Sequence, residues 1–170
     1  DGRHVVFSSN ASGQSNLWRQ EIGGTVATQL TRFTDRAASG VAWSPDGAKL
    51  VFTADHDGNE FHQLFVMGAN GDEPRALTDA PQVQHHLATI EPFSRDGRYL
   101  LYAANDRDRT CQDVLVLDLD TAEAQRIVAT DGLHFPLGFS PDQRLVGVTR
   151  LNSNTDAVVL LVEPGVTDPG

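Results

Sequence analysis

Residues 41–54 read Val41-Ala-Trp-Ser-Pro-Asp-Gly-Ala-Lys-Leu-Val-Phe-Thr-Ala54, two strand-like runs on either side of a tight turn. Each residue type in the turn, Ser44-Pro-Asp-Gly47, favours a bend. Proline fixes φ, aspartate can accept hydrogen bonds from the nearby backbone, and glycine tolerates positive φ. Trp43 and Phe52 belong to the flanking runs, in which apolar residues alternate with smaller or polar ones. This alternation predicts a β-hairpin.

Near-copies of this unit recur along the chain as Ile90–Tyr102, Pro136–Val148 and, for the second half alone, Asp1–Phe7. The turn aspartates, which are Asp1, Asp46, Asp96 and Asp142, are separated by 45, 50 and 46 residues. A period of this length is typical of a propeller blade of four strands, and no segment has a sustained helical period with caps. The sequence therefore predicts an all-β protein, a β-propeller built from four-stranded antiparallel blades, with about four blades in this chain.

The predicted blades span residues 1–33, 34–78, 79–128 and 129–170 of one propeller domain. The first blade lacks its inner strand, and in the fourth blade only Val166–Gly170 is left for the outer strand. Propellers generally have four to eight blades. The chain is therefore either part of a larger ring, or its first and last units share one sheet and close a small ring. The missing strands are not a simple complementary pair, which favours a partial propeller.

The composition argues against several classes of partner. The 170 residues include 13 basic and 23 acidic side chains, for a formal net charge of −10. Binding to nucleic acid depends on lysine and arginine at the phosphates, and anionic membrane surfaces attract basic segments, so we expect neither partner. No apolar run reaches the ~20 residues of a membrane helix. Cys111 is the only cysteine, which excludes an internal disulfide.

The repeated Phe/Trp-Ser-Pro-Asp-Gly motif, followed by an apolar strand, resembles the propeller repeat of TolB-like proteins. It also resembles the N-terminal propeller of the prolyl oligopeptidase family of serine peptidases. Further strings are similar to acylaminoacyl-peptidase-type members of that family, and the resemblance covers almost the whole chain. These strings are Phe7-Ser-Ser-Asn, Asn16-Leu-Trp-Arg, Gln29-Leu-Thr, Phe61-His-Gln-Leu-Phe, Leu77–His86 and Ala103–Asp108.

The peptidase resemblance implies a function without catalysis in this chain. In that family the propeller caps a C-terminal α/β-hydrolase domain, which carries the catalytic serine, aspartate and histidine, and it restricts access to short or unfolded peptides. The implied partners are peptide substrates and this hydrolase domain, which the present residues do not include, and the implied location is the cytoplasm. The alternative is a TolB-like propeller that binds proteins, belongs to no enzyme, and is periplasmic or secreted.

Histidines and charged loop residues form the candidate contact site. In a propeller, the loops that enter the inner strands emerge on the same face as the loops between the second and third strands. The sequence therefore predicts that one group of residues surrounds one end of the channel and contacts the substrate or the hydrolase domain. This group is His85, His86, His134, Asp55, Asp57, Glu60, Asp106, Arg107, Asp108 and Arg109. Three converging imidazoles could bind zinc, but hydrogen-bonded structural histidines are the favoured interpretation, because adjacent residues on a strand point opposite ways.

No catalytic residue, metal ion or cofactor is expected in this chain. The string nearest to a nucleophile elbow, Gly138-Phe-Ser-Pro-Asp142, lacks the final glycine, so we interpret Ser140 as a turn residue. Asp55–Glu60 has oxygens at alternate positions, but Gly58 is not at the sixth loop position and Val66 stands where calcium would need a bidentate glutamate. A polar hairpin loop is therefore favoured there. The chain also lacks the Glu-Glu pair with which dipeptidyl-peptidase-type relatives hold a peptide's N-terminus.

Two turns depart from the repeat. Arg95 stands in place of proline in the third turn, and Gln143 stands in place of glycine in the fourth. A residue other than glycine in the left-handed region costs roughly 1 kcal/mol. We therefore expect the turn of the fourth blade to be distorted.

Overall fold

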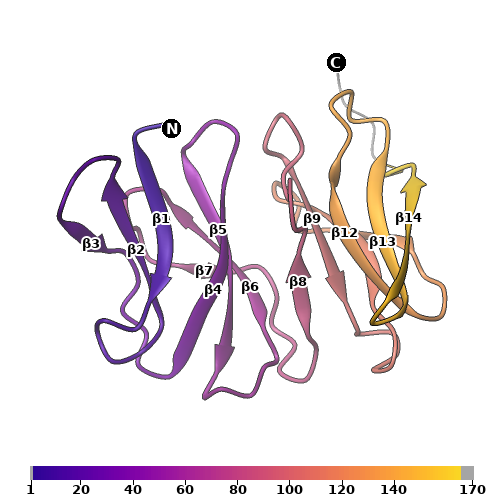
Figure 1. Cartoon of the computed structure of the whole chain (residues 1–170), viewed down its shortest axis with the longest axis horizontal. Helices are drawn as coiled ribbons and strands as arrows, with labels where there is room; N and C mark the ends of the chain where they lie inside the picture. The colour runs from indigo at the N-terminus through magenta and orange to yellow at the C-terminus, as the bar shows by residue number, and fades with distance from the viewer. Residues whose placement is uncertain (1, 166–170) are drawn as a thin grey trace. The chain divides into compact units, whose positions relative to one another are not determined.

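The computed structural model describes residues 2–165, which form β-strands and no helix (Figure 1). No helix able to cross a membrane occurs in this part of the chain. The chain divides into two compact units, Asp1–Gln82 and Val83–Gly170, called here the N-terminal and C-terminal units. The turn aspartate Asp1 and the short segment Val166–Gly170, which the sequence leaves for an outer strand, lie outside the described residues.

The N-terminal unit contains two antiparallel sheets with the strand orders β1-β2-β3 and β4-β5-β6-β7. In both sheets, strands that follow one another in sequence are neighbours in space, as in a propeller blade. The strands of the first sheet are β1 (His4–Ser9), β2 (Asn16–Glu21) and β3 (Ala27–Gln29). Those of the second sheet are β4 (Arg36–Trp43), β5 (Lys49–His56), β6 (Gln63–Gly68) and β7 (Arg75–Ala76).

The C-terminal unit repeats this arrangement with the strand orders β11-β10-β9-β8 and β12-β13-β14. The third sheet consists of β8 (His85–Leu87), β9 (Tyr99–Ala104), β10 (Asp113–Asp118) and β11 (Ala124–Val128). The fourth consists of β12 (Leu133–Phe139), β13 (Val146–Ser153) and β14 (Asp156–Val162). Four antiparallel sheets of three or four strands confirm the predicted all-β, partial-propeller architecture.

A shared set of hydrogen bonds closes the repeated turn. Ser44 Oγ donates to Asp46 Oδ1 at 2.5 Å and accepts from the backbone nitrogen of Lys49 at 2.9 Å. The Gly47 nitrogen donates to the Ser44 carbonyl at 2.8 Å, and Gly47 has a φ of 70°. The turns that begin at Ser94 and Ser140 contain the same three bonds. The serine hydroxyl thus joins the turn to the strand that follows it.

The prediction that the turn of the fourth blade is distorted is wrong. Gln143 does take a φ of 60°, as its position requires. Its side chain, however, forms two hydrogen bonds that glycine could not make. Gln143 Nε2 donates to the Ser140 carbonyl at 2.8 Å, and Oε1 accepts from the Arg95 backbone nitrogen at 2.8 Å. The fourth turn therefore keeps the geometry of the others.

The inner strand of the third sheet is shorter than the repeat suggests. Phe93 lies outside β8 and forms only an isolated bridge with Leu100. The chain before it pairs with β12 instead, because the backbone nitrogens of Ile90 and Glu91 both donate to the Leu137 carbonyl. Gly138 permits this approach, since a Cβ there would lie 2.7 Å from Glu91 Cβ.

Each unit has a hydrophobic core between its own two sheets. The N-terminal core includes Leu17 of β2 together with Leu50, Phe52 and Phe65 of the second sheet. The C-terminal core includes Val114 and Val116 of β10 together with Val146 and Val148 of β13. The alternating apolar positions of the second and third strands account for these contacts. The sheets in turn hold the polar loops at the strand ends.

Candidate functional site

Strand register brings one set of predicted residues together in the C-terminal unit. His85 pairs with Ala104 on one side of β9, and Asp113 pairs with Ala104 on the other. The bridge between Gln112 and Leu133 places the start of β12 beside the start of β10. The loop 105–112, the start of β8 and the start of β12 therefore share one end of this unit, called here the loop end.

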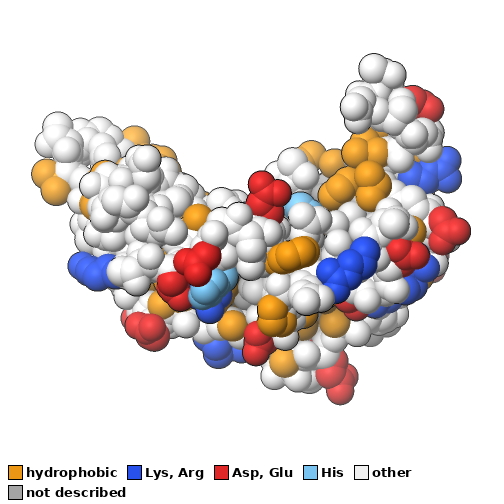
Figure 2. All heavy atoms as spheres, turned by 90° about the horizontal axis from the view of Figure 1, so that it is seen from below, with side chains coloured by type: hydrophobic (Ala, Val, Ile, Leu, Met, Phe, Trp, Pro, Cys, Tyr) orange, Lys and Arg blue, Asp and Glu red, His pale blue; other side chains and the backbone are white. Residues whose placement is uncertain are grey.

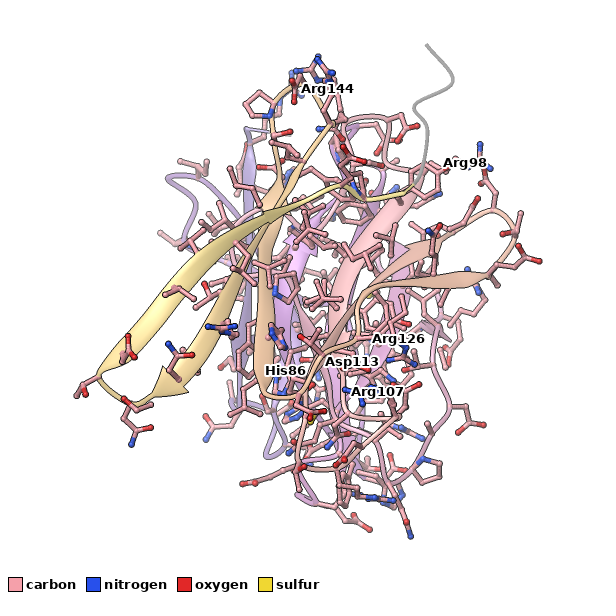
Figure 3. The ribbon with its side chains drawn as sticks, turned by 90° about the vertical axis from the view of Figure 1, so that its right-hand side faces the viewer. His86, Arg98, Arg107, Asp113, Arg126 and Arg144 are labelled. Carbon is pink, nitrogen blue, oxygen red and sulfur yellow. The ribbon has the colours of Figure 1, made fainter. Side chains whose placement is uncertain are left out.

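Asp113 is the centre of a charged network at the loop end. Its side chain is 1% exposed. Arg107 Nε donates to Asp113 Oδ2 at 2.7 Å and Arg107 Nη2 donates to Oδ1 at 2.9 Å, while Arg126 Nη1 donates to Oδ2 at 2.8 Å. Figure 3 shows Arg107, Asp113 and Arg126 gathered at this end, away from Arg98 and Arg144. Paired guanidinium groups of this kind offset the cost of burying a carboxylate.

The network extends to the predicted loop residue Asp106. Arg126 Nη2 donates to Asp106 Oδ2 at 2.8 Å, and this hydrogen bond holds the pKa of the Asp106 carboxyl below its ordinary value of 3.8. The hydrogen bonds that Arg107 donates to Asp113 likewise raise the pKa of the Arg107 guanidinium. Asp106 and Arg107, which the sequence suggests as contact residues, are thus engaged within the unit. Asp108 and Arg109 are exposed beyond them, and the Asp108 carboxylate accepts from the Thr110 backbone nitrogen at 2.8 Å.

Sequence reasoning missed Asp113 and Arg126, although a periodic signal exists. A polar residue begins each of the strands β2, β6 and β10, which occupy equivalent places in the repeat: Asn16, Gln63 and Asp113. Asn16 Oδ1 accepts from the Phe33 nitrogen at 2.8 Å, and Gln63 Oε1 accepts from the Ala80 nitrogen at 2.9 Å. Both side chains thereby hold the segment that leaves the outer strand. At Asp113 the contact is indirect, through Arg107, whose Nη2 donates to the Thr130 carbonyl.

The three candidate histidines have separate surroundings. His134 is 0% exposed, with Nδ1 3.2 Å from the Gln112 carbonyl oxygen and Nε2 3.3 Å from Thr130 Oγ1. His85 is buried, and its ring centroid lies 6.0 Å from that of Tyr102. His86 is partly buried and meets Phe135 edge-on at 5.5 Å. Among residues 2–165, no group of three or more His, Cys, Asp or Glu side chains is arranged to hold a metal ion.

The remaining candidates lie at the end of β5 and in the loop that follows it, in the N-terminal unit. Asp55 is 5% exposed, and its Oδ2 accepts from the Glu60 nitrogen at 3.1 Å. Asp57 and Glu60 are exposed and both have positive φ, at 51° and 62°. His56 lies between Asp35 and Asp57, at 3.4 and 3.2 Å. These residues form a tight polar hairpin loop. That this loop and the loop end surround the same end of a propeller channel stays a prediction.

Ser140, in the string nearest to a nucleophile elbow, and Cys111 both form hydrogen bonds within the C-terminal unit. Ser140 Oγ donates to Asp142 Oδ1 at 2.6 Å and accepts from the Leu145 nitrogen at 3.0 Å, as the turn serines do elsewhere. Cys111 is 5% exposed, and its Sγ accepts from the Gly132 nitrogen at 3.5 Å.

A groove of about 330 Å³ lies at the opposite end of the C-terminal unit, and no sequence pattern pointed to it. Its lining includes Arg98, Tyr99, Asp118, Glu123 and Gln125. Arg98 Nη2 donates to Asp118 Oδ2 at 2.7 Å, and its guanidinium carbon lies 5.2 Å from the centre of the Tyr99 ring. On the face shown in Figure 2, acidic and basic side chains are dispersed among hydrophobic ones.

Comparison with known proteins identifies the repeat. The family model described as the TolB beta propeller domain matches residues 1–163. This chain belongs to that family. The family model covers both units. Its match agrees with the repeated turns and with the sheets in which consecutive strands are neighbours.

Relatives of the chain include both a TolB homologue and a peptidase. The protein TolB homolog of Chlorobium chlorochromatii is 32% identical over 143 residues, which are 84% of this chain and 30% of that protein. The uncharacterized peptidase YuxL of Bacillus subtilis is 33% identical over 130 residues, 66% of this chain and 18% of that protein. The crystal structure of TolB from Acinetobacter baumannii has a TM-score of 0.74 at 15% identity, with 96% of this chain and 39% of that chain covered. The chain thus spans less than a third of the length of these two curated relatives.

Proposed function

We propose that this chain is the non-catalytic propeller portion of a serine peptidase, which docks on a C-terminal α/β-hydrolase domain and gates the access of peptides to it. The observation that carries the proposal is the 33% identity to a peptidase over 130 residues. The Ser140 hydroxyl and the Cys111 thiol each form a hydrogen bond within the C-terminal unit, which is consistent with a chain that contributes no nucleophile. The proposed partners are peptide substrates and the hydrolase domain, and the proposed location is the cytoplasm.

The loop end of the C-terminal unit is the proposed contact surface. Asp113 and its two arginines fix the base of loop 105–112, while Asp108 and Arg109 are exposed beyond it. A loop whose base is already held by charged hydrogen bonds loses less conformational freedom when it meets a partner. Peptide carbonyl and amide groups, or charged side chains of the hydrolase domain, suit such mixed-charge loop residues.

The experiment compares substrate sizes in the full-length protein. We expect Asp113→Ala to free the loop and to raise severalfold the ratio of cleavage rates for a long unfolded polypeptide relative to a short chromogenic peptide. Asp120→Ala is the matched control, because Asp120 is 71% exposed and lies 3.6 Å from Arg98 at the other end of the unit. Arg126→Gln provides a milder second variant, and circular dichroism verifies folding. Faster amide hydrogen exchange in loop 105–112 of the folded Asp113→Ala variant would show that the loop has been freed. If the ratio of cleavage rates is then unchanged, the gating role is refuted.

A second candidate function is a TolB-like propeller that binds protein partners and belongs to no enzyme. The 32% identity to a TolB homolog over 143 residues favours it. This function places the protein in the periplasm or outside the cell. Covalent labelling of the full-length protein by a fluorophosphonate, which reacts with activated serines, separates the two candidates because only the peptidase would react.

A further inference from the structure

Asn70-Gly71 is the one Asn-Gly pair in the 170-residue sequence. It lies in the hairpin between β6 and β7, where Asn70 is exposed and Gly71 has a φ of 93°. A glycine after asparagine leaves the next backbone nitrogen unshielded, because no side chain stands beside it. That nitrogen can then attack the amide carbon of the asparagine side chain.

The surroundings of Asn70 favour this attack. Arg19 Nη1 lies 3.3 Å from Asn70 Oδ1, the oxygen on which negative charge develops when the amide carbon is attacked. A guanidinium placed at a developing oxyanion stabilises it. The Gly71 nitrogen donates to the Gly68 carbonyl at 3.0 Å, so this single turn hydrogen bond must open first.

We propose that Asn70 is a spontaneous modification site that converts to aspartate and isoaspartate in the folded protein. The Gly71 nitrogen forms a bond to Asn70 Cγ, and the side-chain nitrogen leaves as ammonia with the proton of the Gly71 amide. Water then opens the resulting cyclic imide at one of its two carbonyls. The net reaction consumes one water and releases one ammonia, and it changes the net charge by one negative unit.

The modification acts on a contact between two sheets. The hairpin packs on the first sheet, because Arg19 Nη1 also donates to the Ala69 carbonyl at 2.7 Å and a Cβ on Gly71 would lie 3.3 Å from Leu30 Cδ2. Aspartate at position 70 keeps the backbone and places a carboxylate beside Arg19. Isoaspartate adds a methylene to the backbone between positions 70 and 71, which displaces Gly71 from Leu30. We therefore expect only the isoaspartate form to weaken this contact.

The test is to age the folded full chain at mildly alkaline pH and map its peptides by mass spectrometry, with enzymatic methylation to detect isoaspartate. We expect the peptide with Asn70 to gain one mass unit before peptides with the other exposed asparagines, such as Asn10 and Asn154, do. Asn70→Gln is the matched control and should lose this signal. The isolated isoaspartate form should melt at lower temperature than wild type, whereas Asn70→Asp should not.

Two results would overturn the proposal. One is an intact Asn70 in the aged folded chain while the urea-unfolded chain, treated alike, converts at that position. The other is conversion at Asn70 to an isoaspartate form that melts at the same temperature as wild type. This result would show that isoaspartate does not weaken the contact between the two sheets.

Discussion

At the scale of single residues, the serine hydroxyl of the repeated turn links a local bend to the strand that follows. Hydrogen bonding from Ser44 holds the pKa of Asp46 below 3.8, and Ser140 has the same effect on Asp142. At Asp96, burial opposes the shift, but the hydrogen bond from Ser94 helps to lower the pKa as well. These aspartates therefore stabilise the fold above the ordinary carboxyl pKa, and their contribution is lost as pH falls through the lowered folded-state value.

Replacing the turn serine tests this link. We expect Ser44→Ala to raise the pKa of Asp46 toward its ordinary value, because the carboxylate loses a hydroxyl donor. The Lys49 nitrogen also loses its acceptor, at a cost of about 1 kcal/mol in unfolding free energy. Carbon-detected NMR titration of Asp46, with Asp96 as the internal reference, measures the shift. Identical titration of Asp46 in both proteins would contradict the assignment.

Two departures from the repeat form a pair across adjacent turns. Arg95 has a backbone N–H, which proline lacks, and this N–H donates to Gln143 Oε1. Arg95 Nη2 also donates to the Pro141 carbonyl at 2.6 Å. Arginine in place of proline and glutamine in place of glycine therefore support one another.

A double-mutant cycle measures this pairing. Gln143→Gly removes the strain of positive φ, worth about 1 kcal/mol, but it also removes the hydrogen bonds to Arg95 and Ser140. We expect Gln143→Gly to be nearly neutral alone and to be more favourable, by about 0.5 to 1 kcal/mol, in the Arg95→Pro background. Urea unfolding gives the four free energies. Equal effects of Gln143→Gly in both backgrounds would show that the two positions are independent.

At the scale of secondary-structure elements, Asp113 joins the start of β10 to β11 and to the loop 105–112. We expect Asp113→Ala to lower the unfolding free energy by about 3 kcal/mol, because two guanidinium groups lose their buried partner. Asp120→Ala should change it by less than about 0.5 kcal/mol, since that carboxylate is solvated. Urea unfolding of both variants provides the measurement. A loss for Asp113→Ala no larger than that for Asp120→Ala would show that the network is dispensable.

The sheets could be predicted from the sequence because the same turn, followed by an alternating strand, recurs in every blade. The Asp-Gly turn and the alternating strand after it correctly place β5 and β9 within a residue or two. The inner strand β8 is shorter than the pattern indicates because residues 90 and 91 bond to β12, a long-range contact with no local signature. Arg126 is likewise 13 residues from Asp113 along the chain. Its pairing follows from the sheet register, which the sequence alone does not specify.

At the scale of the whole molecule, β14 is an unusually apolar edge. In the described residues no strand pairs with its outer side, and Val159 and Leu161 are 64% and 69% exposed. After Asp156 at its start, β14 contains no charged or proline residue, and a hydrophobic edge of this kind promotes association between chains. The outermost strands of the other three sheets, β3, β7 and β11, have three, two and five residues.

We therefore expect the 170-residue chain to self-associate at high concentration, and Leu161→Lys to weaken this association severalfold. Val26→Lys is the matched control, because Val26 is 78% exposed but lies in the hairpin between β2 and β3. Light scattering over a concentration series follows the association. A wild-type chain that stays a uniform monomer throughout would show that the β14 edge is protected.

We propose that these residues gate the access of peptides to a hydrolase domain and contribute no catalytic residue to it. Fluorophosphonate labelling of the full-length protein, followed by mapping of the labelled peptide, tests it most directly. The account predicts one labelled serine outside residues 1–170, and the same label after Ser140→Ala. A label on Ser140 or on any other serine of these 170 residues would contradict the claim, and so would a full-length protein that does not react.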